Sequence, residues 1–169
     1  MKSAATLTRS RLRETPPKSL YHHDFYAWVG TQVDALRGRR FDELDLENLL
    51  EEVHDLAASL QRELRNRFRI VLVHLLKWQF QPSKHSTSWR VTLLEQRYQL
   101  AELLEQNPSL SRQVPDLLEK VYPSACKRAG LEMKLAKINA QSILPARCPW
   151  TPAQILDDDF LPSPSRPRG

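Results

Sequence analysis

The polar side chains best suited to catalysis lie on one otherwise apolar segment of the sequence. Arg67, His74 and Gln81 follow each other at intervals of seven residues, and Lys77 lies one helical turn from His74. Intervals of seven keep side chains on one stripe of a helix. An imidazole can move a proton near neutral pH, and a lysine or arginine cation can stabilise a developing anion. The spacing therefore makes this stripe a candidate catalytic site.

The arginines before His74 suggest one specific chemistry. Arg69 and His74 fit the Arg-x4-His pattern of the helical HEPN-type ribonucleases, and Arg67 fits its six-residue variant. In metal-independent RNA cleavage of that type, histidine moves the proton of the ribose 2′-hydroxyl and arginine holds the phosphate. Arg67 shares the helical face of His74, whereas Arg69 lies about 140° around the helix. The pattern is short and the chain is rich in arginine, so the match has a high false-positive risk.

The alternative to a catalytic site is a buried structural network. Polar groups among apolar neighbours need partners, because an unpaired buried group costs about 1–3 kcal/mol. The sequence offers partners on the preceding helical segment, and such networks set the register of packed helices. The predicted partners of the stripe are Glu51, Glu52 and Asp55, together with Gln81 at its end.

Metal and thiol chemistry have weaker support in the sequence. Glu51, Asp55 and His74, with His54 nearby, could supply metal ligands, but the Glu-x-x-His pair at 51 and 54 has no second copy. We therefore expect no metal and no cofactor. The two cysteines, Cys126 and Cys148, form no CxxC pair, and we expect buried free thiols.

A second candidate site lies after this segment. The polar run from Lys84 to Ser88 leads into a predicted helix with Arg90 in its first turn. Free backbone amides and the helix dipole favour an anion at such a position. Lys84, Ser88 and Arg90 could therefore hold a phosphate, although an ordinary Ser or Thr cap explains the same residues.

The positive charge of the chain gathers at its ends. The formal net charge is +5 over 169 residues, yet residues 1–18 hold five basic residues and one acidic residue. Both ends are also rich in proline and poor in large apolar residues, so we expect disordered tails at 1–19 and 163–169 around a single domain at 20–162. Basic tails of this kind can bind RNA or DNA weakly and without sequence preference.

The elements that position the candidate residues are all predicted to be helices. Periodicity and capping residues indicate helices at about 22–37, 46–80 as one helix or two, 88–106 capped by Thr87 or Ser88, 115–140 and 152–157. Residues 66–80 are apolar nearly all round, so this segment should be the central buried helix. In the helix at 88–106 the pattern predicts an inward face formed by Val91, Leu94, Tyr98, Ala101 and Leu104. We expect an all-α, irregular helical bundle without sheet or membrane span.

Motifs spread along the chain resemble those of one protein family. They are Tyr21, Asp24, Phe25 and Trp28; Leu44-Asp45, Asn48-Leu49 and Glu51-Glu52; His74-Leu75-Leu76-Lys77-Trp78 and Gln81-Pro82; Ser88-Trp89, Glu95-Gln96-Arg97 and Asn107-Pro108-Ser109-Leu110; Tyr122 with Ala125; and Cys148-Pro149-Trp150-Thr151. Over about residues 20–162 the sequence resembles the bacterial domain-of-unknown-function family number twenty-nine. The resemblance implies a small all-α bacterial, cytoplasmic protein and supplies no catalytic residues.

The apolar stripe between Leu46 and Leu64 suggests the leading function. It offers more apolar surface than a helix with a single neighbour requires. We therefore expect a protein–protein interaction or regulatory module that forms a homo-oligomer or binds a small protein partner. The alternative is an RNA-cleaving or nucleic-acid-binding enzyme that uses the arginines, His74 and Lys77.

Overall fold

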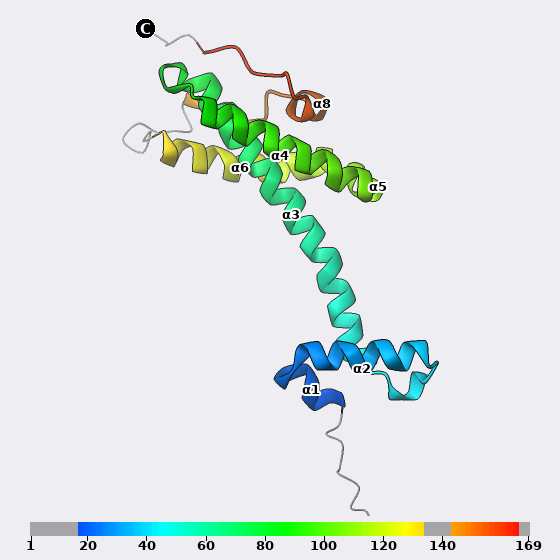
Figure 1. Ribbon diagram of the computed structural model, residues 1–169. Coiled ribbons are helices and arrows are strands. Elements are labelled where there is room, and N and C mark those ends of the chain that lie inside the picture. Colours follow the sequence, from blue (N-terminus) through cyan, green and yellow to red (C-terminus); the bar gives the residue numbers. More distant parts are fainter. Residues whose placement is uncertain (1–16, 134–142, 166–169) are drawn as a thin grey trace, which may run out of the picture. The chain divides into compact units, whose positions relative to one another are not determined.

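The computed structural model describes residues 17–133 and 143–165. The regular elements among these residues are helices, joined by turns and short loops (Figure 1). The chain divides into two compact units, unit 1 up to Leu56 and unit 2 from Ala57 onward. The all-α prediction is confirmed over the described residues. No described helix is long and apolar enough to cross a membrane.

Unit 1 contains α1 (Pro17–His23), α2 (Phe25–Arg37), the 3-10 turn η1 (Phe41–Glu43) and the first part of α3 (Leu46–Phe80). Asp24 caps α2 by accepting a 3.0 Å hydrogen bond from the Ala27 amide. Gly38 is the C-cap of α2, and the left-handed residue that follows is Arg39, with φ of 54°. Because Asp24 starts a new helix, the helix predicted at 22–37 is divided between α1 and α2.

Helix α3 is a single helix of 35 residues, which settles the choice between one helix and two. No glycine or proline interrupts it, so no residue removes a backbone hydrogen bond or favours a bend. Its final part is the predicted buried segment, in which Phe68, Leu72, Leu75 and Leu76 are fully buried. The prediction of a central helix at 66–80 is therefore confirmed within unit 2.

The core of unit 2 forms around this part of α3. The other elements are η2 (Pro82–Lys84), α4 (Thr87–Gln106), α5 (Pro108–Ser111), α6 (Val114–Glu132) and α8 (Pro152–Leu156). One cluster of buried side chains draws on α3, α4, α5, α6 and α8. In Figure 1, α4 and α6 gather around the end of α3, and α8 lies beside α4, with which it is in contact. The irregular bundle of the sequence prediction is thus the architecture of this unit.

The inward face of α4 differs from the prediction. Val91, Leu94 and Tyr98 are exposed, at 58%, 45% and 67%, and Ala101 is exposed too. The buried residues are Leu93, Arg97, Leu100 and Leu103. Leu104 is partly buried against the core, as predicted. The prediction was wrong for the other four residues because it followed apolar side chains alone, whereas Arg97 lies in the middle of the buried face.

Arg97 connects α4 to the C-terminal segment. Its Nε donates to the Ile155 carbonyl at 2.9 Å, Nη1 to the Asp158 carbonyl at 3.2 Å and Nη2 to the Phe160 carbonyl at 2.9 Å. Burial lowers the pKa of the guanidinium, and the nearby carboxylates of Asp158 and Asp157 oppose that shift. The planar fork satisfies three carbonyls that would otherwise lack donors, so this side chain holds the segment after α8 in place.

The caps of the remaining helices follow from local sequence. Ser86, rather than Thr87 or Ser88, caps α4, because its hydroxyl accepts from the Trp89 amide at 3.4 Å. Thr151 caps α8 as predicted and forms a capping box with Gln154. Helix α6 continues through Pro123. The predicted extension of this helix to residue 140 lies outside the described residues, and so do residues 1–16 and 166–169 of the predicted tails at 1–19 and 163–169. Residues 17–19 of the first predicted tail belong to α1, and in the second the Ser165 amide donates to the Gln79 carbonyl at 2.8 Å.

Replacing Arg97 by methionine tests the role of the buried guanidinium. We expect Arg97→Met to lower the free energy of unfolding by about 2–4 kcal/mol, because carbonyls of residues 155–160 lose their donors in a buried site. The matched control is Arg90→Met on the exposed side of the same helix, which should change stability by less than about 0.5 kcal/mol. Urea unfolding followed by circular dichroism measures both, and equal effects of the two variants would contradict the assignment.

Candidate functional site

Lys77 is the most buried cation of the predicted catalytic stripe. Its Nζ donates to Glu132 Oε2 at 2.8 Å and lies 4.4 Å from the centre of the Trp89 ring. Arg128 donates to the other carboxylate oxygen of Glu132 at 2.7 Å. Three elements therefore meet here, because Lys77 comes from α3, Trp89 from α4, and Arg128 and Glu132 from α6.

The surroundings of Glu132 favour its charged form. Burial by itself raises the pKa of the Glu132 carboxyl, but the hydrogen bonds from Lys77 and Arg128 outweigh it and the net pKa is lowered. The aromatic ring of Trp89 adds a favourable contact with the lysine cation. The Glu132 carboxylate of α6, paired with Lys77 of α3 and with Arg128, therefore links α6 to α3.

His74 is half-buried on α3 and has one ring nitrogen occupied. Its Nδ1 lies 2.9 Å from the Ile70 carbonyl oxygen, so Nδ1–H donates to that oxygen. Burial lowers the pKa of the imidazole, with a further lowering by Lys77, while the Ile70 bond and Glu132 oppose the shift. The neutral tautomer that results carries its acceptor lone pair on Nε2. His74 can therefore act as a base only through Nε2.

The two candidate arginines differ in their surroundings. Arg67 donates to Glu63 through Nε at 2.9 Å and through Nη2 at 2.6 Å, and also contacts Gln99 on α4. Arg69 is exposed, and its side chain forms no hydrogen bond or ion pair with another residue of the described ranges 17–133 and 143–165. Gln81 lies beyond the end of α3, where its backbone carbonyl accepts from the Lys84 amide at 3.0 Å. The structure thus places His74 within electrostatic reach of Lys77 and Glu132, whereas Arg67 and Gln81 have other hydrogen-bond partners.

The carboxylates predicted as partners of the stripe belong to unit 1. Glu52 accepts a 2.7 Å hydrogen bond from the Tyr21 hydroxyl. That bond, with smaller effects of burial and of Glu51 and Asp55, raises the pKa of Tyr21 to about 12. Within unit 2, the carboxylates found beside Lys77 and Arg67 are instead Glu132 and Glu63. A shared network of Lys77 or His74 with Glu51, Glu52 and Asp55 stays a prediction.

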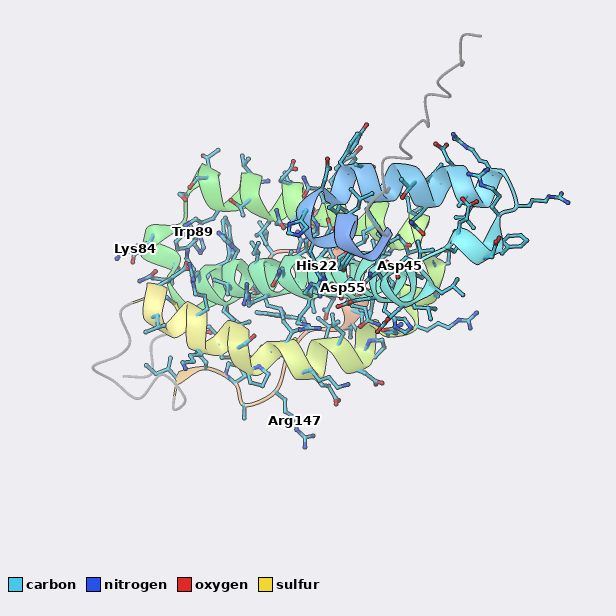
Figure 2. The ribbon with its side chains drawn as sticks, turned by 90° about the horizontal axis from the view of Figure 1, so that it is seen from below. His22, Asp45, Asp55, Lys84, Trp89 and Arg147 are labelled. Carbon is cyan, nitrogen blue, oxygen red and sulfur yellow. The ribbon has the colours of Figure 1, made fainter. Side chains whose placement is uncertain are left out.

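Asp45 organises the polar centre of unit 1. Its Oδ2 accepts from Asn48 Nδ2 at 2.6 Å and from the Trp28 indole at 3.4 Å, and its backbone amide donates to Gln32 at 2.8 Å. Asp45 and Gln32 are both buried, and Asp45 Oδ1 has no hydrogen-bond partner within the part of the chain that the structure describes. Figure 2 shows Asp45 and Asp55 as labelled side chains of unit 1. Among the described residues, no group of three or more potential ligands is arranged to hold a metal ion.

The predicted anion site lies at the N-terminal end of α4, where Figure 2 labels Lys84 and Trp89. Lys84, Ser88 and Arg90 are all exposed. The Ser88 hydroxyl contacts the Ser86 hydroxyl at 2.9 Å. The neighbouring His85 is held by stacking on Trp78 and by a 2.7 Å bond between its Nε2 and the Trp78 carbonyl. Phosphate binding by these three residues stays a prediction.

Cys148 lines a cavity in unit 2. The cavity measures about 530 Å³ and is lined by Leu118, Tyr122, Cys148 and Trp150, with prolines around them. Cys126 and Cys148 are free, and burial raises the pKa of both thiols. A raised pKa disfavours the thiolate, which is the nucleophilic form of cysteine.

Unit 1 has an unusual balance of buried and exposed apolar groups. Among its residues 20–56 the only buried apolar side chains are Trp28 and Ala35. In the described residues, fourteen large apolar side chains are exposed, and nine of them lie in this unit. These nine are Phe25, Tyr26, Val29, Leu36, Phe41, Leu46, Leu50, Val53 and Leu56. The stripe that the sequence predicts is therefore present, and in unit 1 it faces water.

Sequence reasoning missed two important residues of the Lys77 cluster. Glu132 lies 55 positions from Lys77, and no local spacing connects them. Trp89 lies in the first turn of α4, and its spacing in the sequence does not connect it with Lys77. Arg97 falls at helical spacing between Leu93 and Leu100, but the apolar residues at 91, 94 and 98 offer a second face, and spacing does not select between the two.

The comparison with protein-family models gives a match over residues 20–161 to the family described as domain of unknown function DUF29. The chain belongs to the DUF29 family. The resemblance stated from the motifs is thereby confirmed over nearly the whole predicted domain. Comparisons of this DUF29 chain with curated proteins and with solved structures give no match.

The burial of His74 predicts a pH-dependent stability. The pKa of this imidazole is lower in the folded chain than the ordinary value of 6.5, so the unfolded chain binds the proton first as the pH falls. The contribution to stability is therefore complete above the ordinary pKa and is lost below it. We expect the free energy of unfolding, measured with urea at pH 7, 6 and 5, to decrease as the pH falls. This decrease should be smaller in His74→Asn than in the wild-type chain. His54→Asn, which removes an exposed imidazole, is the control, and an unchanged decline in His74→Asn would contradict the assignment.

The ribonuclease hypothesis makes its own prediction. If Nε2 of His74 takes the 2′-hydroxyl proton, single-stranded RNA is cleaved by the purified chain, and His74→Ala lowers the rate at least about 100-fold. End-labelled RNA resolved on a gel, between pH 5 and 8 and with a metal chelator present, measures this rate. Comparing the rates of Arg69→Ala and Arg67→Ala then shows which arginine spacing from His74 supports cleavage. Absence of cleavage that depends on His74 removes the enzymatic hypothesis.

Proposed function

We propose that this DUF29 protein is a protein–protein interaction module whose contact surface is the apolar surface of unit 1. The bacterial and cytoplasmic setting implied by the family resemblance belongs to the same proposal. The observation that carries it is the contrast within unit 1 between two buried apolar side chains and nine large exposed ones. Exposed apolar surface gathered in one region is typical of a binding surface.

The small size of unit 1 strengthens this proposal. A segment of about 40 residues rarely builds a core sufficient for its own stability. The interior of unit 1 is largely polar, with hydrogen bonds of Asp45 to Trp28, Gln32 and Asn48. A larger domain would have apolar packing at its centre. A partner that covers the apolar side chains would therefore supply much of the stabilising burial that unit 1 lacks.

The side chains on α3 form the clearest part of this surface. Leu46, Leu50 and Val53 are exposed at 59%, 62% and 62%, at spacings of four and three residues. We call these three residues the α3 stripe. Spacings of four and three place them on one face of the helix, and none of them belongs to the core cluster. This face is therefore shaped to receive another helix.

The candidate catalytic residues are engaged within the fold, which favours an interaction role over an enzymatic one. Lys77 is paired with Glu132, Arg67 with Glu63, and His74 Nδ1 with the Ile70 carbonyl. An anionic transition state would have to compete with these carboxylates for the cations. Weak polyanion binding by the basic ends of the chain stays a prediction and does not depend on these residues.

Site-specific photo-crosslinking in cells that naturally produce this protein tests the proposal. A benzophenone amino acid at position 50 should give a covalent adduct with a protein, because its side chain would lie in the interface. The matched control places the same probe at position 94, an exposed leucine of α4. An adduct from position 50 that is lost on adding Val53→Asp is the expected result. No adduct at position 50, or adducts only at position 94, would overturn the proposal.

A further inference from the structure

The cavity that Cys148 lines in unit 2 takes no part in the candidate site of α3. Its lining comes from α6 and from residues 146–152, and its volume is about 530 Å³. Sites for small molecules usually measure about 300–1,000 Å³. The Tyr122 hydroxyl of α6 donates to the Pro145 carbonyl at 3.1 Å, and this bond holds the two walls together. The cavity is therefore formed before a ligand enters it.

The buried part of the cavity lining is apolar and aromatic. Leu118, Tyr122 and Trp150 line the cavity and are all buried. Burial raises the pKa of the Tyr122 phenol, so its neutral form is favoured. These three side chains suit the apolar body of a ligand, and the faces of the two aromatic rings also attract cations.

The charged residues of the lining are Glu119 on α6 and Arg147 in the facing segment. Both are exposed, and neither side chain forms an ion pair with the other or with another residue within 17–133 and 143–165. Figure 2 shows the Arg147 side chain pointing away from α6. The carboxylate of Glu119 is therefore the charge that a ligand in the cavity would meet.

The proline inside α6 provides a second acceptor. The helix continues through Pro123, and proline has no backbone N–H. The Glu119 carbonyl, four residues earlier, therefore lacks the amide donor that an α-helix normally offers. The nearby Ser124 hydroxyl donates to the Val121 carbonyl at 2.7 Å instead. Because Glu119 and Pro123 both line the cavity, the carbonyl between them lies at the cavity wall.

We propose that this cavity binds a small organic amine in its protonated form, with an apolar or aromatic body. The ammonium group would donate to the carboxylate and to the backbone carbonyl of Glu119, and the body would pack on the buried lining. An anion would be repelled by Glu119, while the only cation of the lining points away. The site belongs to unit 2 and does not depend on the interaction surface proposed for unit 1.

A titration of the full, ¹⁵N-labelled chain followed by nuclear magnetic resonance tests the proposal. The probe is 2-phenylethylammonium, and the matched controls are the neutral 2-phenylethanol and the anionic 3-phenylpropionate. We expect the ammonium to shift the indole N–H signal of Trp150, identified with Trp150→Phe, along a saturable curve. The two controls should bind at least about tenfold more weakly, because they lack the charge that Glu119 recognises.

Replacing the carboxylate isolates the contribution of its charge. Glu119→Gln keeps the size of the side chain and the backbone carbonyl, and it should lower the affinity for 2-phenylethylammonium at least about tenfold. The matched control is Glu105→Gln on α4, because Glu105 is exposed and does not line the cavity. This control should change the affinity by less than about twofold.

Replacing the proline isolates the contribution of the carbonyl. Pro123→Ala supplies an amide donor within the helix, so the Glu119 carbonyl is no longer free for a ligand. Since the proline ring is also part of the wall, the informative quantity is the ratio of the affinities for the ammonium and the alcohol. We expect this ratio to fall about threefold to tenfold, while the free energy of unfolding does not decrease, because alanine favours a helix.

Three results would overturn the proposal. The first is the lack of a saturable shift of the Trp150 signal with 2-phenylethylammonium. The second is an affinity for the alcohol or the acid that equals or exceeds the affinity for the ammonium. The third is an unchanged ammonium affinity in Glu119→Gln, with circular dichroism showing that the variant is folded.

Discussion

The structure depends on one constraint, which is that the apolar face of α3 must be shielded from water. In unit 2 the chain meets this requirement itself. Leu64, Phe68, Leu72 and Leu75 are fully buried within a single cluster that includes side chains of α4, α6 and α8. Burial of apolar surface contributes about 25 cal/mol per Å², so the places of these helices follow from the need to cover α3. In unit 1 the corresponding side chains remain exposed, and the proposed function follows from that difference.

Buried polar groups give the packing of unit 2 its specificity. Arg97 uses its fixed fork to bind three carbonyls of the segment after α8, and Lys77 joins α3 to α6 through Glu132. Each arrangement is stable only when every partner is in place, because an unpaired buried group is costly. Apolar burial therefore gathers the helices, and these polar contacts define which residues face one another.

The hydrogen bonds of His74 and Lys77 also bear on whether these residues form a catalytic site. A cation, an imidazole and an arginine on one helix would suit acid–base catalysis if they converged on an open site. Here His74 donates to a carbonyl of its own helix and Lys77 to a carboxylate of α6. Residue types alone cannot distinguish these two situations, since both require polar groups among apolar neighbours. Membership of the DUF29 family adds no catalytic residue that would favour the enzymatic interpretation.

The sequence by itself determined the helices, the buried character of residues 66–80 and the surplus of apolar residues between 46 and 56. These features depend on periodicity, caps and the lack of glycine or proline, all of which act within a few residues. Only the tertiary structure decided that Arg97 lies inside while Leu94 and Tyr98 lie outside, and that Lys77 pairs with Glu132. Periodicity shows that a helix has an apolar face, but the buried face is selected by the neighbour that covers it. That neighbour can lie 55 positions away, where local spacing carries no information.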